Sequence, residues 1–357
     1  MSKEEIQIIY ETFMNNNTTS YTDIKNDIEL YIKKLFSNLS IFENNFKNKA
    51  NAKIIYKTTN TIVQNVSSNK INDSIYLNNT FFIGRTGVLG LDALLPFIFI
   101  IVNEKTFQTI INNPKIRKQI KEICHNESGI YEIDDNEFNK TLTLYLQMYI
   151  QSCRNCTHFK IAQKSTNLAQ FFLSFIVSQK NIVYDLNCEW KNFDIHPHPN
   201  GRRSWIEFFI NKKMLFITAF PKTAKQQLKN GNLYKMFGLN PDDHPLSIKF
   251  VKSPVSFCGN TPHKNILESF NELKKSVAEK EFDIAVIGCG AYSMIIGDFI
   301  YTQLNKSSII TGGTVQLWFG IRGKRWDKYD IYNEYWCDIL KEEVPTNSYL
   351  VENGCYF

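Results

Sequence analysis

The sequence predicts an α/β protein with a doubly wound, mostly parallel sheet of the Rossmann-like type. Two strand–glycine–helix units follow one another directly, FDIAVIGCGAYSMIIGDFIYTQL and then SSIITGGTVQLWFG. A near-continuous apolar run at 212–220, KKMLFITAF, precedes them, as expected for a parallel strand covered on both faces. Successive units of this kind build a parallel sheet with helices on both sides.

The first half of the chain predicts an extension and then the start of the sheet. Residues 1–75 are polar with apolar residues at helical spacing, so we expect a helical N-terminal extension. The segment TFFIGRTG predicts a short strand ending in a glycine turn, and the apolar run at 88–103 a buried helix. Helical patterns continue at 138–153 and 168–180.

A proline-rich loop at 196–205 divides the predicted Rossmann-like domain, 76–357, into two halves, 76–195 and 205–357. In the second half, PKTAKQQLKN predicts a helix with Pro221 in its first turn. SIKFVKSPVSF predicts a strand that enters a loop, and NILESFNELKKSVAEKE predicts an amphipathic helix.

Composition limits the classes of partner. The 357 residues carry 41 Lys plus Arg against 35 Asp plus Glu, a net charge of +6, and 43% are hydrophobic, enough for a core. The abundance of Asn, Ile and Lys is typical of an AT-rich genome, and no basic stripe is interleaved with aromatics, so we expect no nucleic acid partner. No apolar run reaches the roughly 18–20 residues that span a bilayer. We expect no transmembrane segment, no secretory signal and a cytoplasmic location.

The eight cysteines are expected to be reduced thiols in such a compartment. Cys153, Cys156 and His158 have ligand types that suit zinc, but a structural zinc site takes four ligands and no second CxxC is present. A helix end with partly buried thiols is the favoured interpretation.

Three glycine turns follow predicted strands: Gly84 to Gly87, Gly288 to Gly290, and Gly312 with Gly313. In a doubly wound sheet such turns lie at the carboxyl ends of strands, where helix N-termini present N–H groups to anions. Ser293 stands in place of the third glycine of the dinucleotide fingerprint, which disfavours a nicotinamide dehydrogenase. We expect a nucleotide-phosphate site; the alternative is that these glycines only let helices pack closely against strands.

A basic cluster at 320–327, GIRGKRWD, follows the third turn. Lys324 and Arg325 lie beside glycines, which suits contact with phosphate. The alternative is that they are only the cations of a solvent-facing helix end, and the sequence supports both interpretations equally. His196 and His198 lie in the proline-rich loop, where histidines are usually exposed and without a catalytic role.

The C-terminal motifs resemble those of a family of bacterial polysaccharide-locus proteins. FDIAVIGCGAY, ITGGTVQLWFGIRGKRWD and the ending ENGCYF are similar to that family's IGAGAYG turn, its GG-x-x-QLLFGI-x-GKRW segment and its terminal GGCYW. KKMLFITAF with Thr223 and Gln227 is similar to its KKVLVIHPF-x-x-TI-x-x-Q, and FFIGRTG to its IGRxG start. The resemblance covers roughly Phe81 to Phe357.

That family is distantly similar to the GT-D class of glycosyltransferases. The class implies a Rossmann-like sheet, a sugar-nucleotide donor and a divalent metal, Mn or Mg, near an Arg-x-Gly-Asp-x-Glu motif. Arg85 and Gly87 match this motif, whereas its two acidic positions are Val88 and Gly90 here. Asp92, the next carboxylate along the chain, is the residue that would have to replace them in holding the metal.

The resemblance implies transfer of a sugar from a nucleoside diphosphate donor to a hydroxyl of a glycan acceptor, in glycan or polysaccharide biosynthesis. Asp92, or alternatively His196, would act as base, and Arg85, Lys324 and Arg325 would compensate the charge of the diphosphate. The expected nucleotide-sugar site consists of Gly84, Gly87, Gly288, Gly290, Tyr292, Gly312, Gly313, Gln316, Lys324, Arg325, Trp326 and Thr223. Two alternatives stay open: a catalytically silent sugar-nucleotide-binding module, and another Rossmann-type transferase such as a methyltransferase.

Overall fold

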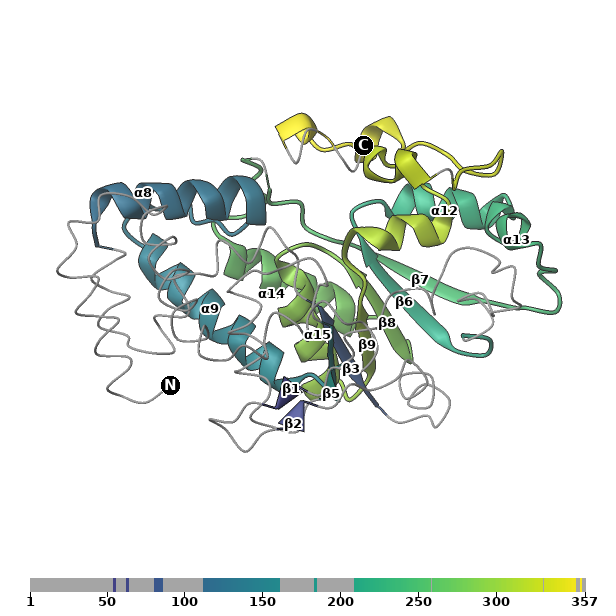
Figure 1. Cartoon of the computed structure of the whole chain (residues 1–357), viewed down its shortest axis with the longest axis horizontal. Helices are drawn as coiled ribbons and strands as arrows, with labels where there is room; N and C mark the ends of the chain where they lie inside the picture. The colour runs from purple at the N-terminus through teal and green to yellow at the C-terminus, as the bar shows by residue number, and fades with distance from the viewer. Residues whose placement is uncertain are drawn as a thin grey trace.

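A seven-stranded parallel sheet forms the centre of the computed structural model, shown in Figure 1. The structure describes residues 80–85, 112–160, 209–257, 259–329, 331–350 and 354, and three two-residue strands at 54–55, 62–63 and 183–184. The sheet order is β5-β4-β3-β9-β8-β6-β7, and every neighbouring pair is parallel. The predicted α/β class with a Rossmann-like parallel sheet is therefore confirmed.

The strands of this sheet are short. Their bounds are Phe82–Arg85 (β3), His158–Lys160 (β4), Val183–Tyr184 (β5), Lys213–Thr218 (β6), Ser247–Lys252 (β7), Ile284–Gly288 (β8) and Ser307–Ile310 (β9). A separate antiparallel pair, Ile54–Ile55 (β1) and Ile62–Val63 (β2), falls within the segment predicted to be a helical extension. The rest of that extension, the predicted helices at 88–103 and 168–180, and the loop at 196–205 lie outside the described residues.

Helices connect the strands. The α-helices are Pro114–Ile123 (α8), Phe138–Asn155 (α9), Pro221–Lys229 (α12), Asn232–Phe237 (α13), Ile266–Ala278 (α14) and Tyr292–Thr302 (α15). Of these, α9, α12, α14 and α15 lie where the sequence predicts helices, whereas α8 and α13 were not predicted. Asn265 caps α14 by accepting a hydrogen bond from Glu268 N, and Pro221 occupies the first turn of α12. Among the described residues, no helix combines the length and the apolar character that a membrane span requires.

Five shorter helical segments complete the described fold. A π-helical turn covers Cys124–Ser128 (η1), and 3-10 segments cover Gly312–Phe319 (η3), Lys324–Tyr329 (η4), Lys341–Glu343 (η5) and Ser348–Leu350 (η6). The sequence predicts a helix after the third glycine turn, and η3 is that helix in 3-10 form. It begins at the left-handed Gly312 and ends at the left-handed Gly320, and its eight residues are long for a 3-10 segment.

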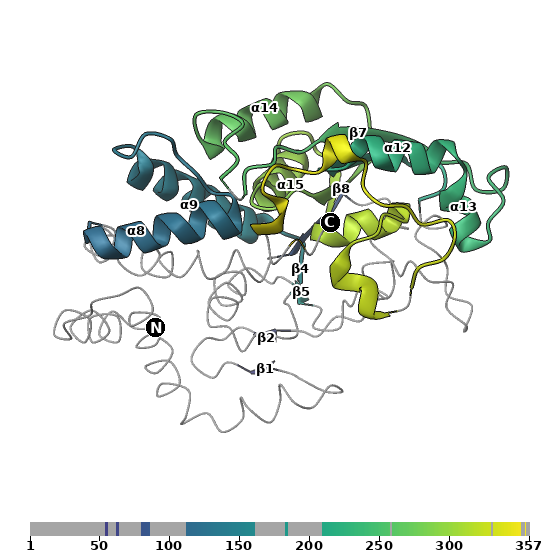
Figure 2. The ribbon, with the colours of Figure 1, turned by 90° about the horizontal axis from the view of Figure 1, so that it is seen from above.

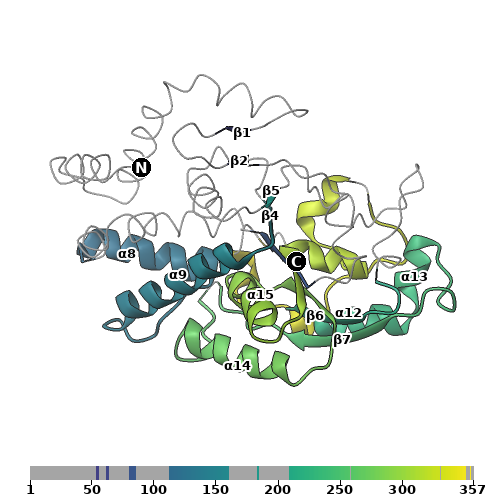
Figure 3. The ribbon, with the colours of Figure 1, turned by 90° about the horizontal axis from the view of Figure 1, so that it is seen from below.

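Each face of the sheet has its own core. Along β6, Leu215 and Ile217 join a cluster with α9, α14 and α15, whereas Met214 and Phe216 join a cluster with α12, α13 and η3. This alternation follows from the two-residue period of a strand. Figure 3 shows α14 and α15 on one side of the sheet and the yellow-green segment that follows β9 on the other.

The chain reverses direction across the sheet between β6 and β8. From β6 the chain passes through α12 to the edge strand β7, and from β8 it passes through α15 in the opposite direction to β9. Because α12 and α15 belong to opposite clusters, they begin on opposite faces at the carboxyl ends of neighbouring strands. In open α/β sheets such reversal points are where ligands bind.

Candidate functional site

The three predicted glycine turns meet at one edge of the sheet. They follow β3, β9 and β8, which are adjacent in that order, and parallel neighbours end at the same edge. Arg85, at the end of β3, donates a hydrogen bond from Nη1 to the carbonyl oxygen of Thr311, at 2.6 Å. The end of β3 is therefore in direct contact with the third turn. Gly87 and Asp92, together with Val88 and Gly90, lie outside the described residues.

The turn after β8 contains two glycines in different surroundings. A Cβ on Gly288 would lie 2.5 Å from the carbonyl oxygen of Gly312, so this glycine allows the second and third turns to pack together. Gly290 has φ of +55°, is exposed, and a Cβ there would meet nothing within 4 Å. Gly290 is thus the glycine of this turn that leaves the backbone open to a ligand. Ser293 turns its hydroxyl back and accepts a hydrogen bond from Cys289 N at 3.1 Å.

Arg85 lies over the turn after β9. A Cβ on Gly312, whose φ is +62°, would come within 3.2 Å of Arg85 Nη1. Arg85, Gly312 and Gly313 are all half-buried. The edge therefore carries a guanidinium group beside two glycine turns, an arrangement that suits an anionic ligand.

Four other predicted ligand residues are buried and contact protein groups. The Gln316 amide donates to the carbonyl oxygen of Arg322 at 2.8 Å, and the ring of Trp326 packs against Gly323. Tyr292 is 1% exposed. Thr223 is also 1% exposed. These side chains belong to the packed layers next to the edge.

The N-terminus of α12 is filled by a carboxylate from the C-terminal segment. Glu343 accepts hydrogen bonds from Lys222 N at 2.7 Å, from Thr223 N at 2.8 Å and from Thr223 Oγ1 at 2.7 Å. Gln227, farther along α12, donates to the carbonyl oxygens of Gly320 and Tyr335 at 3.2 and 2.8 Å. Figures 1 and 2 show the C-terminal segment beside α12. The residues that resemble the family motif thus hold this segment on the sheet.

The basic cluster lies on the surface of that C-terminal segment. Lys324 is exposed, with its Nζ close to Gly354, and the Arg325 guanidinium lies 5.3 Å from the centre of the Trp326 ring. Both cations remain predicted phosphate contacts.

A polar chain that the sequence does not suggest lies behind the β8 turn. Tyr131 OH is 2.8 Å from Ser269 Oγ, and Ser269 Oγ is 2.7 Å from His263 Nδ1. The backbone N of His263 donates to Tyr131 OH at 3.1 Å. These contacts join residues that are up to 138 positions apart, so no local motif could have marked them.

The CxxC thiols are part of the core. Cys153 and Cys156 are buried with α9, and burial raises the pKa of both thiols, as expected of inert structural cysteines. The side chain of His158 is not described. Within the described residues, no group of three His, Cys, Asp or Glu side chains could hold a metal ion.

Cys289 is expected to resist alkylation in the folded protein. Burial raises the pKa of its thiol to about 12, so it stays protonated at pH 8. Because folding raises this pKa, the thiol stabilises the native state below its ordinary value of 9.0, and this contribution is lost as the pH rises toward 12. Iodoacetamide labelling at pH 8 followed by peptide mass spectrometry measures this protection. Labelling of Cys289 as fast in native as in denatured protein would contradict it.

No protein family, curated protein or solved structure matches this chain. The candidate site therefore rests on the geometry above and on the motif resemblance.

Proposed function

We propose that this protein is a glycosyltransferase that binds a nucleoside diphosphate sugar at the carboxyl edge of β3, β9 and β8. The observation that carries the proposal is the contact of Arg85 with the turn after β9, against which the turn after β8, with its exposed, left-handed Gly290, packs through Gly288. The parallel sheet with its reversal point supports it, because ligands of such sheets bind at this edge. The resemblance to polysaccharide-locus proteins supplies the reaction class.

The leaving diphosphate of a sugar nucleotide accumulates negative charge as the glycosidic bond breaks. A guanidinium binds two phosphate oxygens at once, and glycine backbone lets the phosphates approach closely. Arg85 would serve the diphosphate, with Lys324 and Arg325 as further cations and the turns at Gly290 and Gly312 as the surface beneath it.

The Mn or Mg ion that the GT-D resemblance implies does not fit the residues present. The motif's acidic positions are occupied by Val88 and Gly90, and the described residues contain no ligand cluster. No step of the proposal passes through a metal ion. The same replacement favours the second candidate, a module that binds a sugar nucleotide without turning it over.

Arg85→Ala is expected to weaken sugar-nucleotide binding about tenfold, since it removes a charge-assisted contact of about 1.5 kcal/mol or more. Arg85→Lys keeps the charge and should lose less. Arg154→Ala, which removes a cation from the last turn of α9, is the matched control. The measurement is a thermal-shift titration with UDP- and GDP-sugars, NAD and S-adenosylmethionine, with and without manganese.

The same panel decides between the candidates. Stabilisation by S-adenosylmethionine alone would reject the glycosyltransferase. Binding of a sugar nucleotide without any consumption of it would favour the silent module. An unchanged affinity in Arg85→Ala would remove Arg85 from the site.

A further inference from the structure

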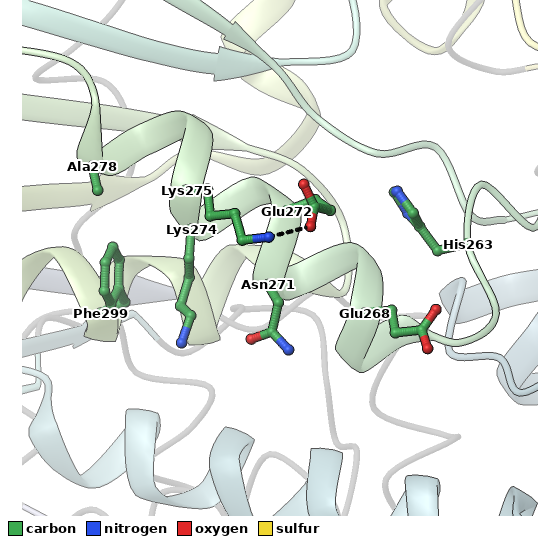
Figure 4. Close-up of a pocket in the computed structure, with 8 residues that line it drawn as sticks. All are labelled: His263, Glu268, Asn271, Glu272, Lys274, Lys275, Ala278 and Phe299. Atoms are coloured by element: carbon green, nitrogen blue, oxygen red, sulfur yellow. Dashed lines mark hydrogen bonds and ion pairs between the residues drawn. The ribbon is translucent and has the colours of Figure 1, made fainter.

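The outer side of α14 carries a groove of about 690 Å³, shown in Figure 4. Its lining includes His263, Glu268, Asn271, Glu272, Lys274 and Phe299. Small-molecule sites commonly measure about 300–1,000 Å³. Because α14 follows the loop that leaves β7 and then runs back toward the start of β8, the His263 end of the groove lies at the carboxyl edge of the sheet.

The lining of this groove carries two glutamates and two lysines, so its formal charges cancel. Lys275 pairs with Glu272 at 2.7 Å, and Lys274 Nζ lies 5.3 and 5.4 Å from the ring centres of Phe270 and Phe299. Glu268 accepts from the backbone N of Lys264 and remains exposed. A phosphate-rich ligand would meet these carboxylates, whereas a neutral polyhydroxyl ligand can donate to them and to the Asn271 amide oxygen. The lining therefore favours a neutral glycan.

His263 is held in one orientation at the end of this groove. Its Nδ1 contacts the hydroxyl of the fully buried Ser269, which also contacts Tyr131 OH. His263 lines the groove, and in the tautomer whose Nδ1–H donates to Ser269 Oγ, Nε2 is the ring nitrogen that can accept a proton. A neutral imidazole that donates from one nitrogen can take a proton on the other.

Ser269 also connects His263 to the donor edge. Tyr292, two residues after Gly290, has a buried hydroxyl that faces Ser256 and Ser269 without making a hydrogen bond of normal geometry. The buried Ser269 thus lies between Tyr292, in the first turn of α15, and the imidazole of His263. The His263 end of the groove and the turn after β8 are therefore connected through Ser269 and Tyr292.

We propose that this groove receives the acceptor, a neutral glycan, and that His263 is the catalytic base; this rests on the proposed function. The acceptor oxygen forms a bond to the anomeric carbon while the bond from that carbon to the diphosphate oxygen breaks. The electron pair of the broken bond leaves with the diphosphate, and the acceptor proton passes to Nε2 of His263 and then to water. Ser269 is a positioning residue.

The test measures donor binding and donor consumption in the full chain, with water or a panel of neutral oligosaccharides (malto-, chito- and xylo-tetraose) as acceptor. His263→Gln is expected to lower consumption at least about 100-fold, the usual contribution of a general base, with donor affinity within about twofold of wild type. His244→Gln is the matched control, because His244 lies in the loop between α13 and β7 and its ring Nδ1 contacts the carbonyl oxygen of Asn240 there, away from α14. Ser269→Ala should shift the acid limb of the pH–rate profile, and Asn271→Ala should reduce stimulation by the oligosaccharide.

The outcomes separate the two proposals. If no sugar nucleotide binds the wild-type chain, the proposed function fails and His263 loses its role with it. If a donor binds but His263→Gln consumes it as fast as wild type, or wild type consumes none, only the base is rejected. If none of the oligosaccharides stimulates consumption over water, the assignment of the groove to a neutral glycan is overturned. Equal melting temperatures for His263→Gln and His244→Gln would show that folding is not the cause.

Discussion

Gly288→Asn is expected to lower the free energy of unfolding by about 3 kcal/mol, whereas Gly290→Asn should lower it by less than about 1 kcal/mol. At 288 a Cβ would lie 2.5 Å from the Gly312 carbonyl oxygen and 2.5 Å from a methyl of Val315. Overpacking of this kind typically costs about 1–3 kcal/mol, and here backbone has to move. At 290 the left-handed backbone suits Asn, and the added side chain points into open space.

The same pair tests the ligand site. If the diphosphate approaches the backbone at Gly290, Gly290→Asn should bind sugar nucleotides much more weakly while it unfolds at nearly the wild-type urea concentration. Urea unfolding and a thermal-shift titration of both variants measure the two effects. Equal destabilisation at the two positions would reject the steric argument, and unchanged nucleotide affinity in Gly290→Asn would place the ligand elsewhere.

Glu343→Ala is expected to cost about 2–3 kcal/mol of stability. The substitution leaves the backbone N–H groups of Lys222 and Thr223 without their acceptor at the start of α12. Loss of a helix cap costs about 0.5–2 kcal/mol, and hydrogen bonds to a charged group contribute about 1.5–3 kcal/mol. Glu343 is also buried, so water reaches these groups poorly.

Glu342→Ala is the matched control for this prediction. Its carboxylate pairs with Lys222 Nζ at 3.3 Å, and both side chains are more than half exposed, so the pair contributes little. Urea unfolding should place Glu342→Ala close to wild type and Glu343→Ala well below it. A Glu343→Ala protein as stable as Glu342→Ala would mean that the C-terminal segment is not held through α12.

Local patterns predicted most of the described fold. The near-continuous apolar run of β6, Pro221 at the start of α12 and the glycine after β8 are each properties of a few neighbouring residues, and the elements form where these residues lie. The meeting of the three turns also followed, because the carboxyl ends of parallel strands share one edge.

The features that local sequence patterns did not predict depend on contacts between residues far apart in the chain. Glu343 and Thr223 are 120 residues apart, and Tyr131 and Ser269 are 138 apart, so neither pair has a signature in sequence. Phe220, which precedes α12, has a side chain that cannot accept a hydrogen bond. This feature of the sequence indicates that another segment supplies the cap of α12. Thr223 and Gln227 match the motif of the resembled family in sequence, and in the structure they bind the C-terminal segment.

The position of β3 between β4 and β9 has a consequence for synthesis on the ribosome. Arg85 and Thr311, which bond across this pair, are 226 residues apart, and translation at about 5–20 residues per second separates their emergence by roughly 10–45 s. During that interval the apolar strand that contains Phe82 and Ile83 has no partner on its inner side. The edge of β3 that later pairs with β9 therefore stays open in the nascent chain until Ser307–Ile310 have been made.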